Sequence, residues 1–149
     1  VDDVQYVATM MNGNRTIDLG GTVLVFKLDG DATLPIAEIV QQEVPEQPDE
    51  EYSPQLVSQG DGLYHAQCAS CHGGIGIPSE VAIVAPDLRL MTLDTHGDFE
   101  NIVLEGARAE QGMPDFEDAV TNEQLEAIRA FIVNQARQLR EYQQNSQAQ

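Results

Sequence analysis

Basic residues are scarce in this chain of 149 residues, where seven Lys and Arg stand against 25 Asp and Glu. A nucleic-acid surface gains its affinity from Lys and Arg that neutralise phosphates, so nucleic acid is a very poor candidate partner. Residues 1–52 hold eleven acids and two bases, and residues 53–149 hold fourteen and five, so each part carries a charge of −9. This even spread indicates a surface adapted to a salty medium or one that steers a basic partner.

Long apolar runs are also missing. The longest candidates are Thr22–Phe26 and Val81–Ala85, far short of the roughly 18 apolar residues that a membrane helix needs. No transmembrane segment is expected. The sequence opens with Val1 rather than an initiator Met, as expected where a signal peptide has been removed or where the chain is cut from a longer protein.

The first third of the chain has the composition of β-strands. Residues 5–11 and 21–28 are short runs rich in apolar and β-branched side chains, bounded by the turn-forming segments 12–14 and 29–31. A hairpin of this size is marginal by itself. Residues 1–42 are therefore expected to form the edge of a larger β structure.

A linker and a helical region follow. Residues 43–52 are acidic, contain two prolines and show no periodicity, which predicts a stiff, extended linker. Beyond it, helices are expected over 53–68, from Asp98 to Gly106 and from Thr121, where Thr-x-x-Gln has the form of a capping box. The predicted divisions are a β segment over 1–42, the linker over 43–52, a helical domain over 53–142 and a frayed tail over 143–149.

Both cysteines lie in Cys68-Ala-Ser-Cys71-His72, the Cys-x-x-Cys-His pattern of c-type haem attachment. Two cysteines three positions apart at a helix end can bind the two vinyl groups of a porphyrin as thioethers. The adjacent histidine then points its imidazole at the iron. One pentapeptide thus predicts covalent attachment of haem c and its first axial ligand.

Three other interpretations of the motif are weaker. A thioredoxin-like redox pair would follow a strand in a βαβ unit, which the pattern around Cys68 lacks. A structural zinc site would need a fourth ligand, such as His65 or His96, beside Cys68, Cys71 and His72. A disulfide between the cysteines would close a very small loop and stabilise little.

The second iron ligand decides between an electron carrier and an enzyme with an open iron. Met113 is the preferred candidate, because Gly112 allows close approach of the backbone and Pro114 stiffens the loop. The candidates considered are Met10, Met11, Met91, Met113, His65 and His96.

The remaining candidates have ordinary structural interpretations. Met91, the second choice, has apolar neighbours and is expected to fill the core. Met10 and Met11 belong to a strand and are expected to pack. His65 is expected at the surface or the edge of a pocket, and His96 in a solvated turn.

The second half of the chain resembles class I cytochrome c domains over about residues 53–140. Gly60 and Tyr64 stand eight and four residues before the first cysteine, where that family crosses its first helix against its last. Ile128 and Phe131 would be their counterparts on the last helix. The resemblance implies a mainly α class I cytochrome c fold, here with an N-terminal β-hairpin extension and an extended linker.

A narrower resemblance points to the C-terminal haem domain of quinohaemoprotein alcohol dehydrogenases. It rests on Ala-Pro-Asp-Leu-Arg over 85–89, Phe-x-x-Ile-Val-Leu-x-Gly-Ala over 99–107 and Gly-Met-Pro-Asp-Phe over 112–116. Residues 20–30 and 32–35 are similar to the last propeller strand of that family and the start of its linker. In those enzymes a β-propeller with pyrroloquinoline quinone (PQQ) and calcium oxidises the alcohol. That propeller is missing from these 149 residues, so no alcohol oxidation is assigned to this chain alone.

The resemblance also implies roles for residues around the haem. The backbone carbonyl of Pro86 would accept a hydrogen bond from His72 and orient its ring. Arg89 would pair with a haem propionate, which suits a bidentate guanidinium. Leu88 and Ile102 would form walls of the haem site.

Together these patterns predict one-electron transfer through haem c, with Cys68 and Cys71 as thioether anchors and His72 and Met113 as axial ligands. The expected donor is a PQQ-dependent dehydrogenase, and the expected acceptor is a cytochrome, a blue-copper protein or a membrane oxidase. The expected compartment is the periplasm. The chain would be a fragment or domain of such a dehydrogenase or a free-standing carrier. An alternative of another class is a haem peroxidase or ligand sensor with an open sixth position.

Overall fold

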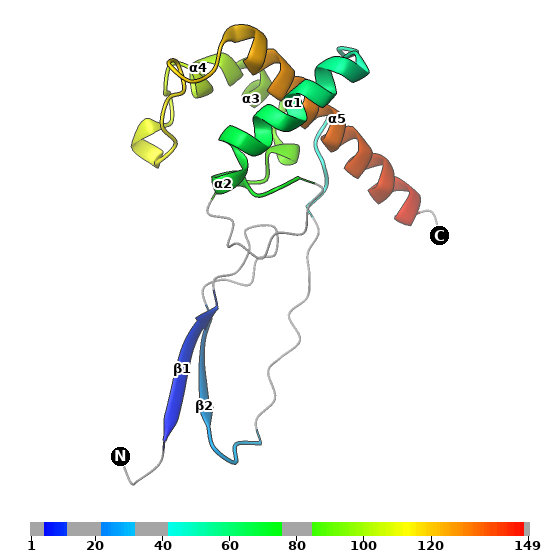
Figure 1. The fold of residues 1–149 in the computed structure, drawn as a ribbon. Coiled ribbons are helices and arrows are strands. Elements are labelled where there is room, and N and C mark those ends of the chain that lie inside the picture. Colours follow the sequence, from blue (N-terminus) through cyan, green and yellow to red (C-terminus); the bar gives the residue numbers. More distant parts are fainter. Residues whose placement is uncertain (1–4, 12–21, 32–41, 76–84, 148–149) are drawn as a thin grey trace.

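The computed structural model of this chain describes residues 5–11, 22–31, 42–75 and 85–147, and the turn expected at 12–14 lies outside them. The described part is mainly helical with a two-stranded hairpin at its N-terminal end, which confirms the predicted fold class (Figure 1). No helix in these ranges is long and apolar enough to cross a membrane. The elements are β1 (Tyr6–Met11), β2 (Thr22–Lys27), α1 (Pro54–Gln67), α2 (Ala69–His72), η1 (Leu88–Leu90), α3 (Leu93–Gly97), α4 (Phe99–Val103), η2 (Ala109–Gln111) and α5 (Asn122–Gln147).

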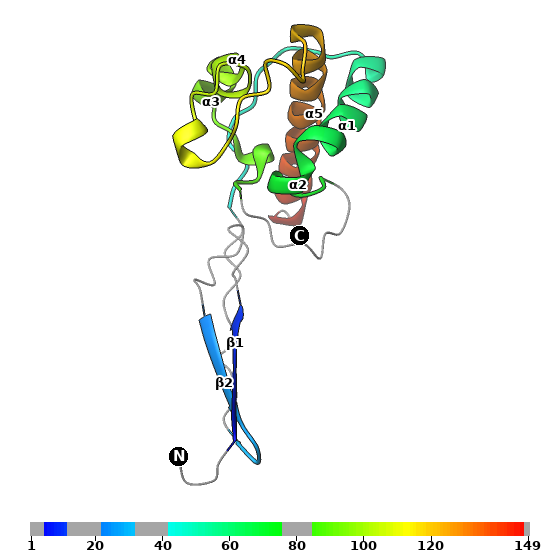
Figure 2. The same cartoon turned by 60° about the vertical axis from the view of Figure 1, so that its left-hand side comes forward.

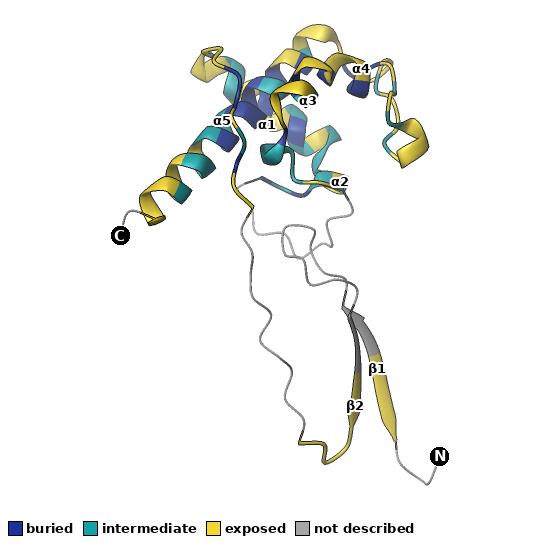
Figure 3. Cartoon of the chain, turned by 180° about the vertical axis from the view of Figure 1, so that it is seen from behind, coloured by how far each residue is buried: buried dark blue, intermediate teal, exposed yellow. Residues whose placement is uncertain are grey.

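The two strands form an antiparallel hairpin whose register pairs Tyr6 with Lys27 and Met11 with Thr22. Its described side chains are exposed, as Figure 3 shows in yellow. Val7 and Phe26 face each other across the ladder and are 56% and 50% exposed. Large apolar side chains left in water on a two-stranded ribbon agree with the expectation that this segment needs a partner surface.

The central packing contact is the crossing of α1 with α5. Helix α1 begins at Ser53, whose side chain accepts a hydrogen bond from the backbone N–H of Leu56 at 3.2 Å. A Cβ placed on Gly60 would lie 1.8 Å from the carbonyl oxygen of Ala127 and 2.9 Å from Cβ of Phe131. Only glycine permits this approach of the two backbones. The resemblance had proposed Ile128 beside Phe131; the nearest residue of α5 is Ala127.

Helix α5 starts with the predicted capping box. The Thr121 N–H donates to Oε1 of Gln124 at 2.9 Å, and the Gln124 N–H donates to Oγ1 of Thr121 at 3.3 Å. Its apolar face is buried along the first four turns. The helix continues to Gln147, so the prediction of a frayed tail from residue 143 is wrong for residues 143–147. The side chain of Gln143 is itself hydrogen-bonded, to the N–H of Val44 and the carbonyl of Gln42.

The shorter helices complete the core on the other side of α5. Figure 2 shows α1 and the α3–α4 pair on opposite sides of α5, with α2 below. Phe99, Ile102 and Val103 of α4 are buried. Gly106 follows in the left-handed region with φ of 70°, the conformation expected of a glycine just after a helix. The short helix α3 was not predicted, because Leu93 is its one apolar side chain and no period can be seen.

The acidic segment 42–53 contains no helix or strand, and it lies along α5. The guanidinium of Arg137 donates to the backbone carbonyls of Pro48 and Glu50, the second at 2.9 Å. Arg129 forms an ion pair with Glu50 at 3.1 Å. Ten residues of α5 follow Arg137, so it lies well before the C-terminal end of its helix. Its guanidinium binds the segment that precedes α1.

His96 is buried, at 3% exposure, so the expectation of a solvated turn residue is wrong. It lies on α3, and its Nε2 is 3.1 Å from Oε1 of Gln47 in the acidic segment. Nε2 of Gln47 in turn donates to the carbonyl of Met91 at 3.3 Å. A buried amide from the predicted linker therefore joins α3 to the segment before α1.

Candidate functional site

The Cys-x-x-Cys-His motif lies at the end of α1, where the chain turns into the four-residue helix α2. The hydroxyl of Tyr64, on the last turn of α1, is fully buried and donates to the carbonyl of Gly73 at 2.8 Å. Gly73 ends α2 with φ of 81°, a value that favours glycine. These contacts close the motif into a compact loop that holds the two thiols and the imidazole near one another.

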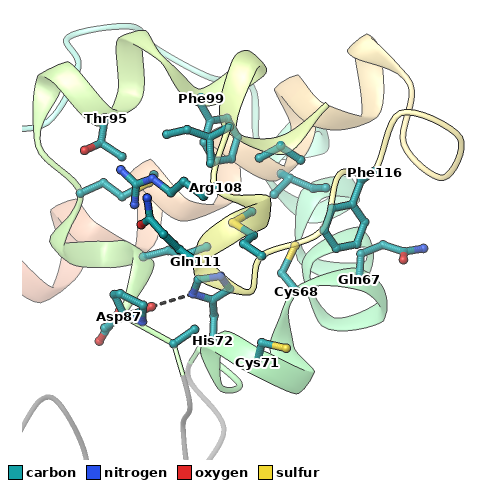
Figure 4. Close-up of a pocket in the computed structure, with 18 of the residues that line it drawn as sticks. Gln67, Cys68, Cys71, His72, Asp87, Thr95, Phe99, Arg108, Gln111 and Phe116 are labelled. Carbon is teal, nitrogen blue, oxygen red and sulfur yellow. Dashed lines mark hydrogen bonds between the residues drawn. The ribbon is translucent and has the colours of Figure 1, made fainter. Parts of the chain in front are cut away.

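The imidazole of His72 is oriented by the backbone. Its Nδ1 lies 2.7 Å from the carbonyl oxygen of Pro86, drawn as the dashed line in Figure 4. A carbonyl oxygen accepts, so Nδ1 carries the proton and Nε2 keeps its lone pair free to bind a metal. This is the hydrogen bond that the resemblance led us to expect.

A cavity of about 900 Å³ opens beside the motif. The thiols and the imidazole come from one side, and Phe99 and Phe116 are among the side chains of other elements that complete it (Figure 4). Most of its lining is apolar. The lining residues include Cys68, Cys71, His72, Pro86, Leu88, Met91, Thr95, Phe99, Ile102, Arg108, Gln111, Met113 and Phe116.

Met113 lines the same cavity from the loop between η2 and α5. The loop is shaped by Gly112, whose φ of 92° a side chain would oppose, and by the N–H of Met113, which donates to the carbonyl of Arg108 at 3.2 Å. Met113 is half-buried and packs against the core. The cavity thus contains both the predicted proximal imidazole and the predicted distal thioether.

The other ligand candidates have different surroundings. Met91 also lines the cavity, but it is 7% exposed and belongs to the core cluster. Nδ1 of His65 contacts Asp61, 2.8 Å from the carboxylate, on the face of α1. His96 is held by the acidic segment. The side chains of Met10 and Met11 lie outside the described residues.

The two cysteines form no disulfide, and Cys68 is half-buried while Cys71 is exposed. Burial, with a smaller contribution from the neighbouring Cys71, raises the pKa of the Cys68 thiol to about 11. A dithiol redox site requires the opposite shift, toward the thiolate. Among the described residues, no three His, Cys, Asp or Glu side chains form a group that could hold a metal ion, which weighs against the zinc interpretation.

The remaining predicted residues differ in whether they line the cavity. Leu88 and Ile102 line it, as the resemblance implied. The guanidinium of Arg89 pairs with the carboxylate of Asp87 at 2.6 Å, and Arg89 is not among the lining residues. Its pairing with a propionate stays a prediction without support from this geometry. Arg108, which we did not single out in the sequence, is the arginine that lines the cavity.

These residues fit a covalently attached haem. A largely apolar cavity of this volume suits a porphyrin, two unpaired thiols stand at its edge, and an imidazole with one free nitrogen and a thioether line it. Nitrogen and thioether sulfur are the donors that cytochromes c offer to iron. The structure alone therefore supports the cofactor indicated by the motif.

Residues 55–132 match the family described as Cytochrome C oxidase, cbb3-type, subunit III. Among curated proteins, the 1-butanol dehydrogenase (cytochrome c) of Thauera butanivorans is 37% identical over 117 residues, covering 78% of this chain and 16% of that protein. The quinohemoprotein alcohol dehydrogenase ADH IIB of Pseudomonas putida is 35% identical over 144 residues, covering 87% of this chain and 20% of that protein.

Solved structures give the same relationship. The quinohemoprotein alcohol dehydrogenase ADHIIG of Pseudomonas putida HK5 superposes with a TM-score of 0.64 at 30% identity, over 95% of this chain and 22% of that one. The quinohemoprotein alcohol dehydrogenase of Comamonas testosteroni gives a TM-score of 0.56 at 30% identity, over 94% of this chain and 21% of that one. This chain thus spans about a fifth of the length of these relatives. Because the family match covers more than half of the chain, including the whole motif and the α1–α5 crossing, this protein belongs to the cytochrome c family and is related to the cytochrome c domains of quinohaemoprotein alcohol dehydrogenases.

Proposed function

We propose that this chain transfers single electrons through one haem c, held by thioethers at Cys68 and Cys71 and ligated by His72 and Met113. The observation that carries the proposal is the common cavity: the attachment motif and a methionine from a distant loop line it together. When bound, the haem supplies an iron that alternates between the ferric and ferrous states. A ligand set of histidine and methionine raises the reduction potential, as suits an electron acceptor.

The residues of this chain have distinct tasks in that function. Pro86 fixes the ring of His72, so Nε2 would be available to ligate a bound iron. The loop bond from Met113 to Arg108 limits movement of the thioether. Apolar side chains such as Leu88 and Ile102 would form part of the wall around a bound haem. Small reorganisation around the cofactor favours rapid electron transfer over ligand chemistry.

The relatives suggest where the electrons come from. The names of the matched proteins describe alcohol dehydrogenases that are quinohaemoproteins or that use a cytochrome c. We propose a PQQ-dependent dehydrogenase as the donor, with its β-propeller, quinone and calcium outside this chain. The acceptor would be a cytochrome, a blue-copper protein or a membrane oxidase, and the compartment the periplasm, where haem c is attached. The chain would act as a domain of that dehydrogenase or as a free-standing carrier.

The first test is the absorption spectrum of the oxidised and reduced protein together with its denatured mass. We expect a low-spin c-type spectrum and a mass raised by one haem. A colourless protein with the bare chain mass, made in cells that attach haem c, would contradict the proposal. A high-spin or five-coordinate iron would instead favour the peroxidase or sensor alternative.

The distal ligand is tested by Met113→Ala. Loss of the thioether should open the iron to carbon monoxide and abolish the weak methionine–iron absorption band. The reduction potential should fall by about 59 mV or more, which corresponds to at least a tenfold decrease in the equilibrium constant for one-electron reduction. Met91→Leu is the matched control, because Met91 lines the same cavity, and it should keep the band. Loss of the band in the Met91 variant and its retention in the Met113 variant would move the ligand to Met91.

A further inference from the structure

Arg108 is a cation at the haem cavity without an anion of its own. Three other arginines of the helical part have carboxylate partners: Arg89 with Asp87, Arg129 with Glu50 and Arg137 with Glu51. Within the described ranges, no carboxylate lies within ion-pair distance of Arg108, although the side chain is half-buried and lines the cavity. A guanidinium beside apolar walls is stabilised when a bound group supplies the negative charge.

The short helix η2 directs two polar side chains into this cavity. Arg108 caps η2 and Gln111 ends it, and residues three apart on a 3₁₀-helix lie on the same face. Figure 4 shows the two side chains projecting together toward the side of the cavity where Thr95 of α3 stands. An otherwise apolar cavity therefore has one polar corner, formed by Thr95, Arg108 and Gln111.

The donors in this corner suit a carboxylate. A guanidinium offers parallel N–H groups to two oxygens, and an amide and a hydroxyl can each donate one more hydrogen bond. Haem carries two propionate carboxylates on the porphyrin edge away from its vinyl groups. We infer that Arg108, with Gln111 and Thr95, binds a haem carboxylate, an inference that rests on the proposed haem c function.

Arg89, which the resemblance assigned to this role, is engaged elsewhere. The side-chain Nε and Nη2 of Arg89 donate to the two carboxylate oxygens of Asp87 at 2.6 to 3.1 Å. The backbone N–H of Arg89 donates to the same carboxylate at 2.9 Å. Asp87 also caps η1. Arg89 therefore stabilises the turn that carries Pro86 and Leu88, and its charge is already neutralised.

The test is the reduction potential of the haem-loaded protein with the charge of Arg108 removed. Arg108→Gln leaves the charge of the bound carboxylate uncompensated, which favours ferric over ferrous iron. The reduction potential should therefore fall by the amount that corresponds to a three- to tenfold decrease in the equilibrium constant for haem reduction. Arg108→Lys keeps the charge and should recover most of the potential. Arg140→Gln, on α5 and not among the lining residues, is the charge-matched control and should shift the potential much less.

The outcomes separate this inference from the proposed function. The unmodified protein must first show one covalent haem and the methionine–iron band, and failure there would overturn the proposed function before Arg108 is tested. With that spectrum present, an Arg108→Gln shift no larger than that of Arg140→Gln overturns the inference. If Arg108→Gln fails to take up haem, Gln111→Leu and Thr95→Val still test the corner, and potentials unchanged in both variants would overturn the inference.

Discussion

His96 is a histidine whose burial restricts it to the neutral form. Its Nε2 donates to Oε1 of Gln47, and its Nδ1 is buried without a partner among the described residues. Burial, with a smaller contribution from the charge of Arg129, lowers the pKa of His96 to about 4, while Glu50 acts in the opposite direction. A second proton on the ring would have no acceptor in this environment.

This burial makes the stability of the fold depend on pH. The unfolded chain protonates His96 below about pH 6.5, while the folded chain resists until about pH 4, so stability falls as pH decreases through that window. The loss attributable to His96 should be on the order of 3 kcal/mol. Urea unfolding of the haem-loaded protein at pH 7, 5 and 4 measures it, and His96→Gln should show a shallower decline. Equal slopes in the two proteins would contradict the assignment, because the carboxylates titrate alike in both.

The sequence revealed the attachment residues because they are local to one pentapeptide, and the spacing of Cys68, Cys71 and His72 needs no other part of the chain. The environment of His96 could not be read in the same way. Its partner Gln47 lies 49 residues earlier in a segment without periodicity. Arg89 and Arg108 illustrate the same limit, since only the folded chain shows which of them is neutralised by a carboxylate and which lines the cavity.

At the scale of the helices, the α1–α5 crossing depends on one glycine. Gly60→Ala would place a methyl group 1.8 Å from the carbonyl oxygen of Ala127, so the helices would have to separate. Unfolding in urea should show a loss of about 3 kcal/mol or more, as for overpacked cores. Gly62→Ala is the matched control, because a Cβ there meets nothing within 4 Å, and it should stabilise α1 by about 0.5–1 kcal/mol. Equal effects of both substitutions would show that helix propensity, and not the crossing, controls stability.

Helices α1 and α5 and the position of the short helix α4 were predictable, and the other short elements were not. Ser53 and the pair Thr121–Gln124 mark helix starts through side chains that bond the first free N–H groups. The end of α5 was misjudged because its last turns are polar and show no apolar period. In the structure Gln143 contacts the segment before α1, so a tertiary contact accompanies the continuation of the helix.

At the scale of the whole molecule, the net charge of −18 opposes compaction. Added salt should therefore raise the melting temperature of the haem-loaded protein, by about 2–4 °C for each kcal/mol of repulsion that is screened. Most of the gain should appear below roughly 0.2 M NaCl, where the screening length falls from about 30 to about 8 Å. Haem absorbance during thermal unfolding measures this effect. A melting temperature that falls with salt, or rises only at molar salt, would contradict the role of self-repulsion.

What could be read from the amino-acid order was the chemistry of contiguous residues: the haem-attachment motif, the helix caps, the strand pair and the Gly-Met-Pro loop. Folding added the relationships between distant residues: Ala127 against Gly60, Gln47 against His96, the acidic segment against Arg137, and Arg108 rather than Arg89 at the cavity. The reason is physical. Backbone geometry and caps depend on neighbours a few positions away, whereas the partner of a buried polar group or a cation depends on which segments hydrophobic packing brings together.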